Sequence, residues 1–176
     1  MKNHYSKPLF VNGSICHNSL LLILLLLSGS MFAQPQEAKK VDSLIQISDT
    51  LSDLHKRMEN YHKIATFNLN FNIATAYDYS LRTRNLSLKL KNREYELLAL
   101  KNMTSYYLRT ASYDSSLLLN GEAMQLAQEI GDKTMQAHLL RDMGRVLYLH
   151  GMHPESLEAS FKAAAIFLGS LSCIQL

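Results

Sequence analysis

The chain has 176 residues, with 18 Lys or Arg, 15 Asp or Glu, and a formal net charge of +3. This charge is too small for a general nucleic-acid-binding protein, which normally has a larger excess of basic residues. The length is that of a single domain once any targeting segment is set aside.

Residues 1–33 have the layout of a secretory signal peptide. Two lysines precede an unbroken Leu and Ile run over residues 20–27, and small residues follow it. Such a run is too short to span a bilayer comfortably and is typical of a segment removed on export. We expect cleavage after Ala33, with Ser30 as a rival site, and an exported, periplasmic protein. The alternative is an uncleaved segment that anchors the protein to the membrane.

Cleavage at this point changes the charge and the cysteine count of the working protein. It removes Lys2 and Lys7, which leaves 16 basic against 15 acidic residues, and it removes Cys16. Only Cys173 then remains, so an internal disulfide is impossible. We therefore expect stability to come from helix packing.

Residues 34–56 are predicted to form a short linker and one extra helix. Apolar or small residues recur there at spacings of three and four, which is the pattern of one helical face. They are Val41, Leu44, Ile45, Ser48, Leu51 and Leu54.

The remainder, residues 57–176, repeats with a period of 40. In the last repeat, four positions hold Gly144, Gly151, Ser156 and Ala163. The positions 40 residues earlier hold Thr104, Ala111, Ser116 and Ala123. Those another 40 residues earlier hold Ile64, Phe71, Ala76 and Thr83. A fixed period of this length indicates a solenoid of stacked units. We divide the region into repeats at 57–96, 97–136 and 137–176.

Each repeat is predicted to be a pair of helices, which makes the protein all-α. In the first repeat the helices should cover about 52–69 and 73–90. In the last, Gly151 should adopt the left-handed conformation that ends a helix, and Pro154 should lie in the first turn of the next. In the middle repeat, we expect Asp114 to be the N-cap of the second helix.

These helix pairs resemble the tetratricopeptide repeat. The resemblance rests on Met143-Gly144, Gly151, Ser156 and Ala163, and more weakly on the equivalent positions of the preceding repeat. It implies a right-handed α-solenoid of about three helix pairs that binds a peptide or partner domain in its concave groove. Thr104 and Ile64 depart from the pattern, because the family places glycine there.

A signal peptide followed by 40-residue repeats is also similar to the exported sensory region of certain bacterial histidine kinases and helix-turn-helix regulators. The alternative function is therefore a sensory input region of a longer signal-transduction protein. No phosphate-binding glycine loop, metal-spaced cysteine pair or nucleophile elbow occurs in the sequence. We accordingly expect no enzymatic activity, cofactor or metal.

The first helices of the repeats should line the groove. The residues predicted to face it are Tyr61, Asn68, Lys101, Arg109, His138, Arg141, Arg145 and Tyr148. This set is basic and aromatic and contains no acid, so it suits an acidic peptide held by arginines and anchored on tyrosines. The alternative is a basic face in contact with solvent alone.

The last helix is predicted to be an uncovered end of the solenoid. Ile166, Phe167 and Leu171 belong to an apolar C-terminal stretch, whose side chains cannot all face the preceding repeat. Terminal repeats need a polar cap. We therefore expect self-association through these residues, or a following repeat that covers them.

Overall fold

The computed structural model describes residues 34–172, and all regular structure within that range is helical. The helices are α2 (Gln34–Ser48), α3 (Leu54–Asn68), α4 (Ile73–Leu90), α5 (Arg93–Arg109), α6 (Tyr113–Glu129), α7 (Lys133–Leu149) and α8 (His153–Ser172). Met1–Lys40 and Val41–Leu176 are two compact units. The predicted signal peptide and its cleavage site lie outside the described residues.

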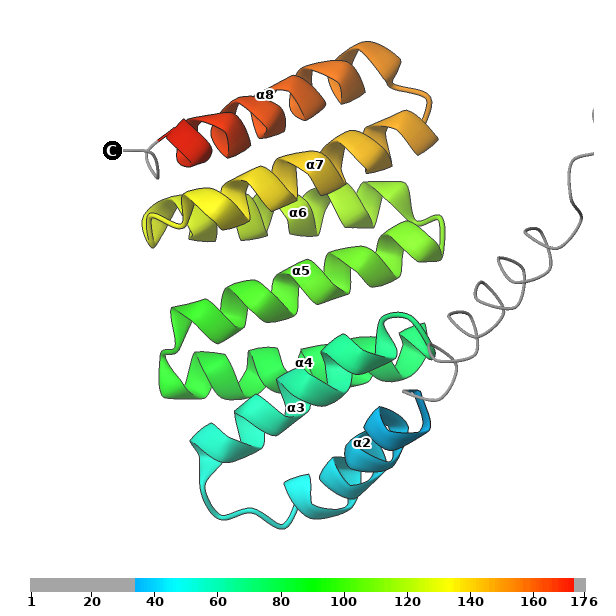
Figure 1. The fold of residues 1–176 in the computed structure, drawn as a ribbon, viewed down its shortest axis with the longest axis vertical. Coiled ribbons are helices and arrows are strands. Elements are labelled where there is room, and N and C mark those ends of the chain that lie inside the picture. Colours follow the sequence, from blue (N-terminus) through cyan, green and yellow to red (C-terminus); the bar gives the residue numbers. More distant parts are fainter. Residues whose placement is uncertain (1–33, 173–176) are drawn as a thin grey trace, which may run out of the picture. The chain divides into compact units, whose positions relative to one another are not determined.

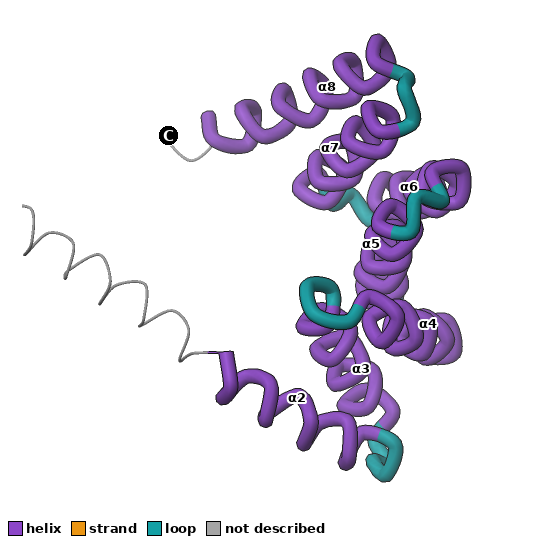
Figure 2. Tube along the Cα trace, turned by 90° about the vertical axis from the view of Figure 1, so that its right-hand side faces the viewer, coloured by secondary structure: helices purple, strands orange, loops and turns teal. Residues whose placement is uncertain are grey.

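The second unit contains the predicted three helix pairs, α3/α4, α5/α6 and α7/α8, packed in chain order (Figure 1). Each helix from α4 to α7 packs on the helix before it and on the helix after it. The first helices of the pairs, α3, α5 and α7, lie on one side of α4 and α6 (Figure 2). This all-α solenoid confirms the fold class predicted from the 40-residue period.

Four of the turns share one geometry at a spacing of 20 residues. Lys91, Ala111, Gly131 and Gly151 have positive φ angles of 55°, 56°, 75° and 86°. In each case the next residue donates its backbone N–H to the carbonyl five residues back, at 2.8–2.9 Å. This pair of features is the Schellman motif, which ends a helix by satisfying its free carbonyls. The prediction for Gly151 is confirmed, and the same turn recurs at every half-repeat from residue 91 onward.

The residues that follow Lys91, Ala111 and Gly131 are the N-caps of the next helices. The side chains of Asn92 and Asp132 accept backbone N–H groups at 3.1 and 2.8 Å. In the middle repeat this position is Ser112, and α6 begins at Tyr113. The prediction that Asp114 is the N-cap was wrong, because the turn geometry places the cap directly after Ala111. Asp114 lies in the first turn instead, where its charge suits the helix dipole.

Small residues allow close crossings within the pairs. A Cβ added to Gly144 would lie 2.8 Å from Ser160 Oγ and 3.2 Å from the Ser156 carbonyl oxygen. The Ser156 hydroxyl donates to the Gly144 carbonyl at 2.8 Å. One repeat earlier, Ser116 donates to the Thr104 carbonyl at 3.1 Å. The repeated small residues therefore mark one recurring hydrogen-bonded contact.

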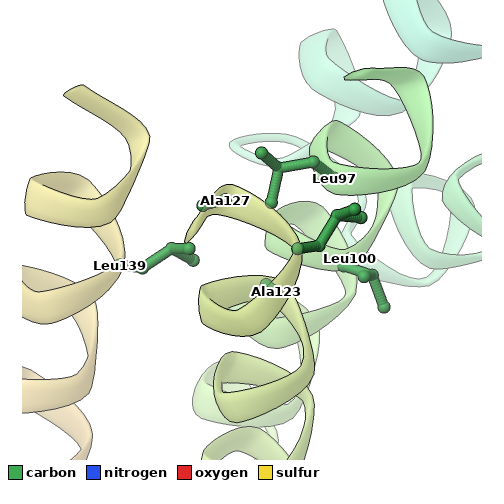
Figure 3. Close-up of a cluster of buried hydrophobic side chains, with 6 residues drawn as sticks. Leu97, Leu100, Ala123, Ala127 and Leu139 are labelled. Atoms are coloured by element: carbon green, nitrogen blue, oxygen red, sulfur yellow. The ribbon is translucent and has the colours of Figure 1, made fainter. Parts of the chain in front are cut away.

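The core lies at the junctions between successive helices. One cluster joins α5, α6 and α7 through Leu97, Leu100, Ala123, Leu126, Ala127 and Leu139 (Figure 3). A second joins the end of α2 to α3 and α4 and includes Val41, Tyr61, Ile64, Ala65 and Tyr79. Over residues 34–172, each helix is too short or too polar to cross a membrane.

Candidate binding hollow at the ends of α3, α5 and α7

A hollow of about 540 Å³ opens where α3, α5 and α7 end. Its lining consists of Leu69, Asn70, Ser105, Leu108, Arg109, Arg145 and Leu149. Its volume is in the range of ligand-binding clefts, and its mixture of leucines with a few polar groups is typical of them. We call it the first-helix hollow.

The 40-residue period produces this hollow. Leu69, Arg109 and Leu149 occupy one repeat position at the ends of three successive first helices. Ser105 and Arg145 share another position, one helical turn earlier. Because equivalent residues of stacked repeats lie on the same side, these two positions bring side chains from three helices to one place.

Two of the predicted groove residues, Arg109 and Arg145, meet in this hollow. Arg109 is exposed, and its guanidinium donates to the Leu69 carbonyl at the end of α3. Arg145 is also exposed, and no ion pair to it occurs within residues 34–172. Arg109 lies in the last turn of α5, where the helix dipole favours a positive charge. Arg145 has no carboxylate partner in this part of the chain.

Arg141 differs from the prediction. Its guanidinium contacts Asp142 Oδ1 at 3.0 Å through Nη2 and at 3.2 Å through Nε. The Asp142 side chain is only 12% exposed. The expectation that this face has no acidic counterpart was wrong, because the neighbouring residue on α7 supplies one. Arg141 is therefore less available to a ligand than Arg145.

Tyr61 and Asn68 are buried. The Tyr61 ring packs 5.6 Å from the Tyr79 ring, and its hydroxyl donates to Asp49. Burial and this hydrogen bond raise the pKa of Tyr61. The Asn68 amide donates to the Ile64 carbonyl at 2.9 Å. Both side chains are committed to α3 and its neighbours and have no free face for a partner.

His138 and Lys101 lie further from the hollow, toward the middle of the first helices. The His138 ring is half-buried, 5.2 Å from the Phe167 ring. Burial lowers the pKa of His138, and the positive charges of Lys101 and Arg141 lower it further. Burial also lowers the pKa of His62 on α3, and the charge of the half-buried Lys101 lowers it further. The three first helices therefore share one positive field in this region.

Tyr148 is 60% exposed near the end of α7, and its ring lies 5.2 Å from the His153 ring. It is one residue before Leu149, which lines the hollow. An exposed tyrosine beside an opening is available as an aromatic anchor.

Within residues 34–172, no group of three or more His, Cys, Asp or Glu side chains is arranged so that it could hold a metal ion. His150 instead lies 4.0 Å from Asp114 and packs on the Tyr113 ring at 5.5 Å.

No protein-family model matches the chain, and no curated protein matches it closely enough to transfer a family or a function. The tetratricopeptide resemblance therefore rests on the motif residues and on the helical-repeat architecture.

Proposed function

We propose that the protein is an exported interaction module of the tetratricopeptide type that binds an acidic segment of a partner protein in the first-helix hollow. The observation that supports this most is the meeting of Arg109 and Arg145 among Leu69, Leu108 and Leu149. Guanidinium groups bind carboxylates through two parallel N–H donors, and the leucines provide an apolar floor. The preferred ligand has an Asp or Glu next to an apolar residue. Export is supported by the apolar run of residues 20–27.

Paired arginine substitutions test this proposal. Short fluorescent peptides containing Glu-Leu pairs serve as probes, and Gln-Leu peptides of the same length serve as neutral counterparts. We expect only the acidic series to bind, and we expect Arg109→Glu plus Arg145→Glu to weaken binding at least tenfold. A charge-assisted hydrogen bond contributes about 1.5–3 kcal/mol, and about 1.4 kcal/mol corresponds to tenfold in affinity.

The matched control is Lys56→Glu plus Lys89→Glu, which makes the same change in net charge at exposed positions away from the hollow. Fluorescence anisotropy reports affinity, and circular dichroism checks that helicity is retained. Equal weakening by the two double variants would show that general charge attraction, rather than the hollow, explains the binding. Equal binding of acidic and neutral peptides would also exclude the proposal.

A further inference from the structure

The basic face of the first helices continues from the hollow toward the middle of α5 and α7, which lie on the same side of the solenoid (Figure 2). Lys101 lies one helical turn before Ser105, and Arg141 lies one turn before Arg145. Ser105 and Arg145 line the first-helix hollow. The residues of each turn share one repeat position, so the four side chains form two neighbouring rows. A bound segment that extends from the hollow along these rows reaches Lys101.

Two histidines lie near Lys101, one on each neighbouring first helix. The His62 ring of α3 packs edge-on against the Tyr95 ring of α5, with centroids 5.6 Å apart and an interplanar angle of 89°. The His138 ring of α7 lies 5.2 Å from the ring of Phe167, which is itself half-buried. Both imidazoles are half-buried, and the Nδ1 of each is buried without a hydrogen-bond partner in the described part of the chain. Each ring is therefore held in place by an aromatic neighbour.

Lys101 is within electrostatic reach of both rings. Burial lowers the pKa of His62 and of His138, and the charge of Lys101 lowers each pKa further. No ion pair to Lys101 occurs within residues 34–172. These three residues, which we call the Lys101 cluster, thus consist of an unpaired cation and two imidazoles whose protonation it opposes.

The other charges near the Lys101 cluster supply little negative potential. The histidine of α3 also faces Lys63, which lowers its pKa. His138 faces Arg141, which lowers its pKa, and the carboxylates of Asp142 and Asp132, which raise it by smaller amounts. Asp142 is bonded to Arg141 at 3.0 Å, so much of its charge is offset there. An acidic ligand would bring the negative charge that this part of the chain lacks.

We infer that binding of an acidic segment along the first helices is coupled to proton uptake by His62 and His138, so that the protein binds its partner more tightly in mild acid. This inference rests on the proposed function and adds a means of regulating it. A ligand carboxylate beside Lys101 offsets the charge that opposes protonation of the two rings. Because coupling between two ligands is reciprocal, protonation of the rings strengthens carboxylate binding by the same factor.

The histidines set the pH range in which the coupling acts. An ordinary histidine has a pKa of about 6.5, and burial lowers both values here, so the rings are neutral above about pH 7. Glutamate side chains titrate near about 4.3 and remain ionised at about pH 5.5. Affinity should therefore be constant above about pH 7, rise as pH decreases, and level off only below the histidine pKa values of the free protein.

Binding of one acidic peptide at two pH values tests the coupling. The probe is a fluorescent peptide of about eight alternating Glu and Leu residues, which spans about 27 Å when extended and so reaches past the hollow. Fluorescence anisotropy on the full chain is expected to show binding at least about threefold tighter at about pH 5.5 than at about pH 7.5. Equal affinity at the two pH values would overturn this inference and leave the proposed function standing. Absence of binding at both would overturn the two together.

Histidine substitutions assign the effect to the cluster. His62→Gln plus His138→Gln is expected to bring the ratio of the two affinities close to unity. The matched control is His55→Gln plus His150→Gln, which removes two histidines at exposed positions outside the cluster and should keep the ratio. The ratio is taken within each variant, so a general change in affinity cancels, and circular dichroism at both pH values checks helicity. A ratio that persists in the cluster variant, or that the control loses equally, would contradict the inference.

Proton uptake can also be measured without any substitution. Calorimetric titration of the unaltered chain with the acidic peptide at about pH 6, in two buffers with different heats of ionisation, gives the number of protons bound with the ligand. Net uptake is expected. Zero uptake would overturn the inference even if the double histidine variant failed to fold.

Discussion

At the residue scale, the four Schellman turns differ in how well their left-handed residue suits its conformation. Glycine adopts positive φ without steric conflict, whereas a Cβ makes it unfavourable by about 1–2 kcal/mol. Gly131 and Gly151 satisfy this requirement, but Lys91 and Ala111 do not. Two of the four turns therefore have a favourable residue at the left-handed position, and two have an unfavourable one.

We predict that Ala111→Gly stabilises the protein by about 0.5–1 kcal/mol, since relief at positive φ outweighs the greater freedom of glycine in the unfolded chain. Gly131→Ala should destabilise it by about 1 kcal/mol, although no atom lies within 4 Å of the added Cβ. Urea denaturation followed by circular dichroism measures both. Gly121→Ala is the control, because Gly121 lies inside α6, where alanine is the better helix former. A loss of stability in Ala111→Gly would contradict the account.

Gly144 has a different requirement, namely space. We predict that Gly144→Ala destabilises the protein by about 1–3 kcal/mol, the range for overpacking, because the new methyl would press on Ser160 and on the backbone of α8. Adding Ser160→Ala removes the nearest atom and should recover part of the loss, while the Ser156 carbonyl contact remains. Thermal denaturation of the single and double variants measures this recovery. Additive losses would show that the crossing is not the cause.

At the element scale, Arg82 joins α4 to its neighbours. Its guanidinium contacts Asp78 at 2.9 Å and Asp49, in the linker before α3, at 3.4 Å. It also lies over the Tyr79 ring, 4.9 Å from the centroid. The ion pairs are partly exposed and contribute little by themselves, whereas the position over a ring adds about 0.5–1 kcal/mol.

We therefore predict a loss of about 1 kcal/mol in Arg82→Ala. Lys162→Ala is the control, since Lys162 pairs with Glu158 on α8 and both side chains are exposed. It should lose about half as much, because no aromatic ring lies beneath it in the described part of the chain. Chemical denaturation separates the two, and an equal loss would show that the ring contact contributes nothing measurable.

The sequence predicts the elements of this fold well and the partners of individual side chains poorly. The predicted helix 73–90 coincides with α4, because a fixed period reveals where chain direction must change. Asp114 was assigned as a cap because its type suits one, whereas Ser112 is selected by the left-handed residue before it. In the site, the period identified Arg109 and Arg145. It did not show that Asp142 pairs with Arg141 or that Tyr61 is buried, since both depend on side-chain conformations that spacing does not determine.

At the scale of the whole molecule, helices that contact mainly their sequence neighbours make stability a sum over successive junctions. Two contacts between helices, one between α3 and α5 and one between α7 and α8, contain half-buried histidines. His62 of α3 packs on Tyr95 of α5, with ring centroids 5.6 Å apart, and His138 of α7 packs on Phe167 of α8. Each Nδ1 is buried without a hydrogen-bond partner in the described part of the chain. A protonated ring at either site has an Nδ1–H with no acceptor in this part of the chain.

This arrangement predicts that the protein loses stability in mild acid. Burial lowers the pKa of His62, and the charges of Lys101 and Lys63 lower it further; burial, Lys101 and Arg141 lower the pKa of His138, against smaller opposing effects of Asp142 and Asp132. The unfolded chain, whose histidines titrate near about 6.5, then binds more protons than the folded chain just below that pH. The free energy of unfolding should be constant above about pH 7, fall as pH decreases below about 6.5, and level off below the lowered folded-state pKa values. Urea titrations from about pH 8 to about pH 5 measure this slope.

His62→Gln plus His138→Gln should flatten the dependence of stability on pH, whereas His55→Gln, at an exposed position of α3, should not. A slope unchanged in the double variant would mean that carboxylates, rather than these two junctions, set the acid sensitivity.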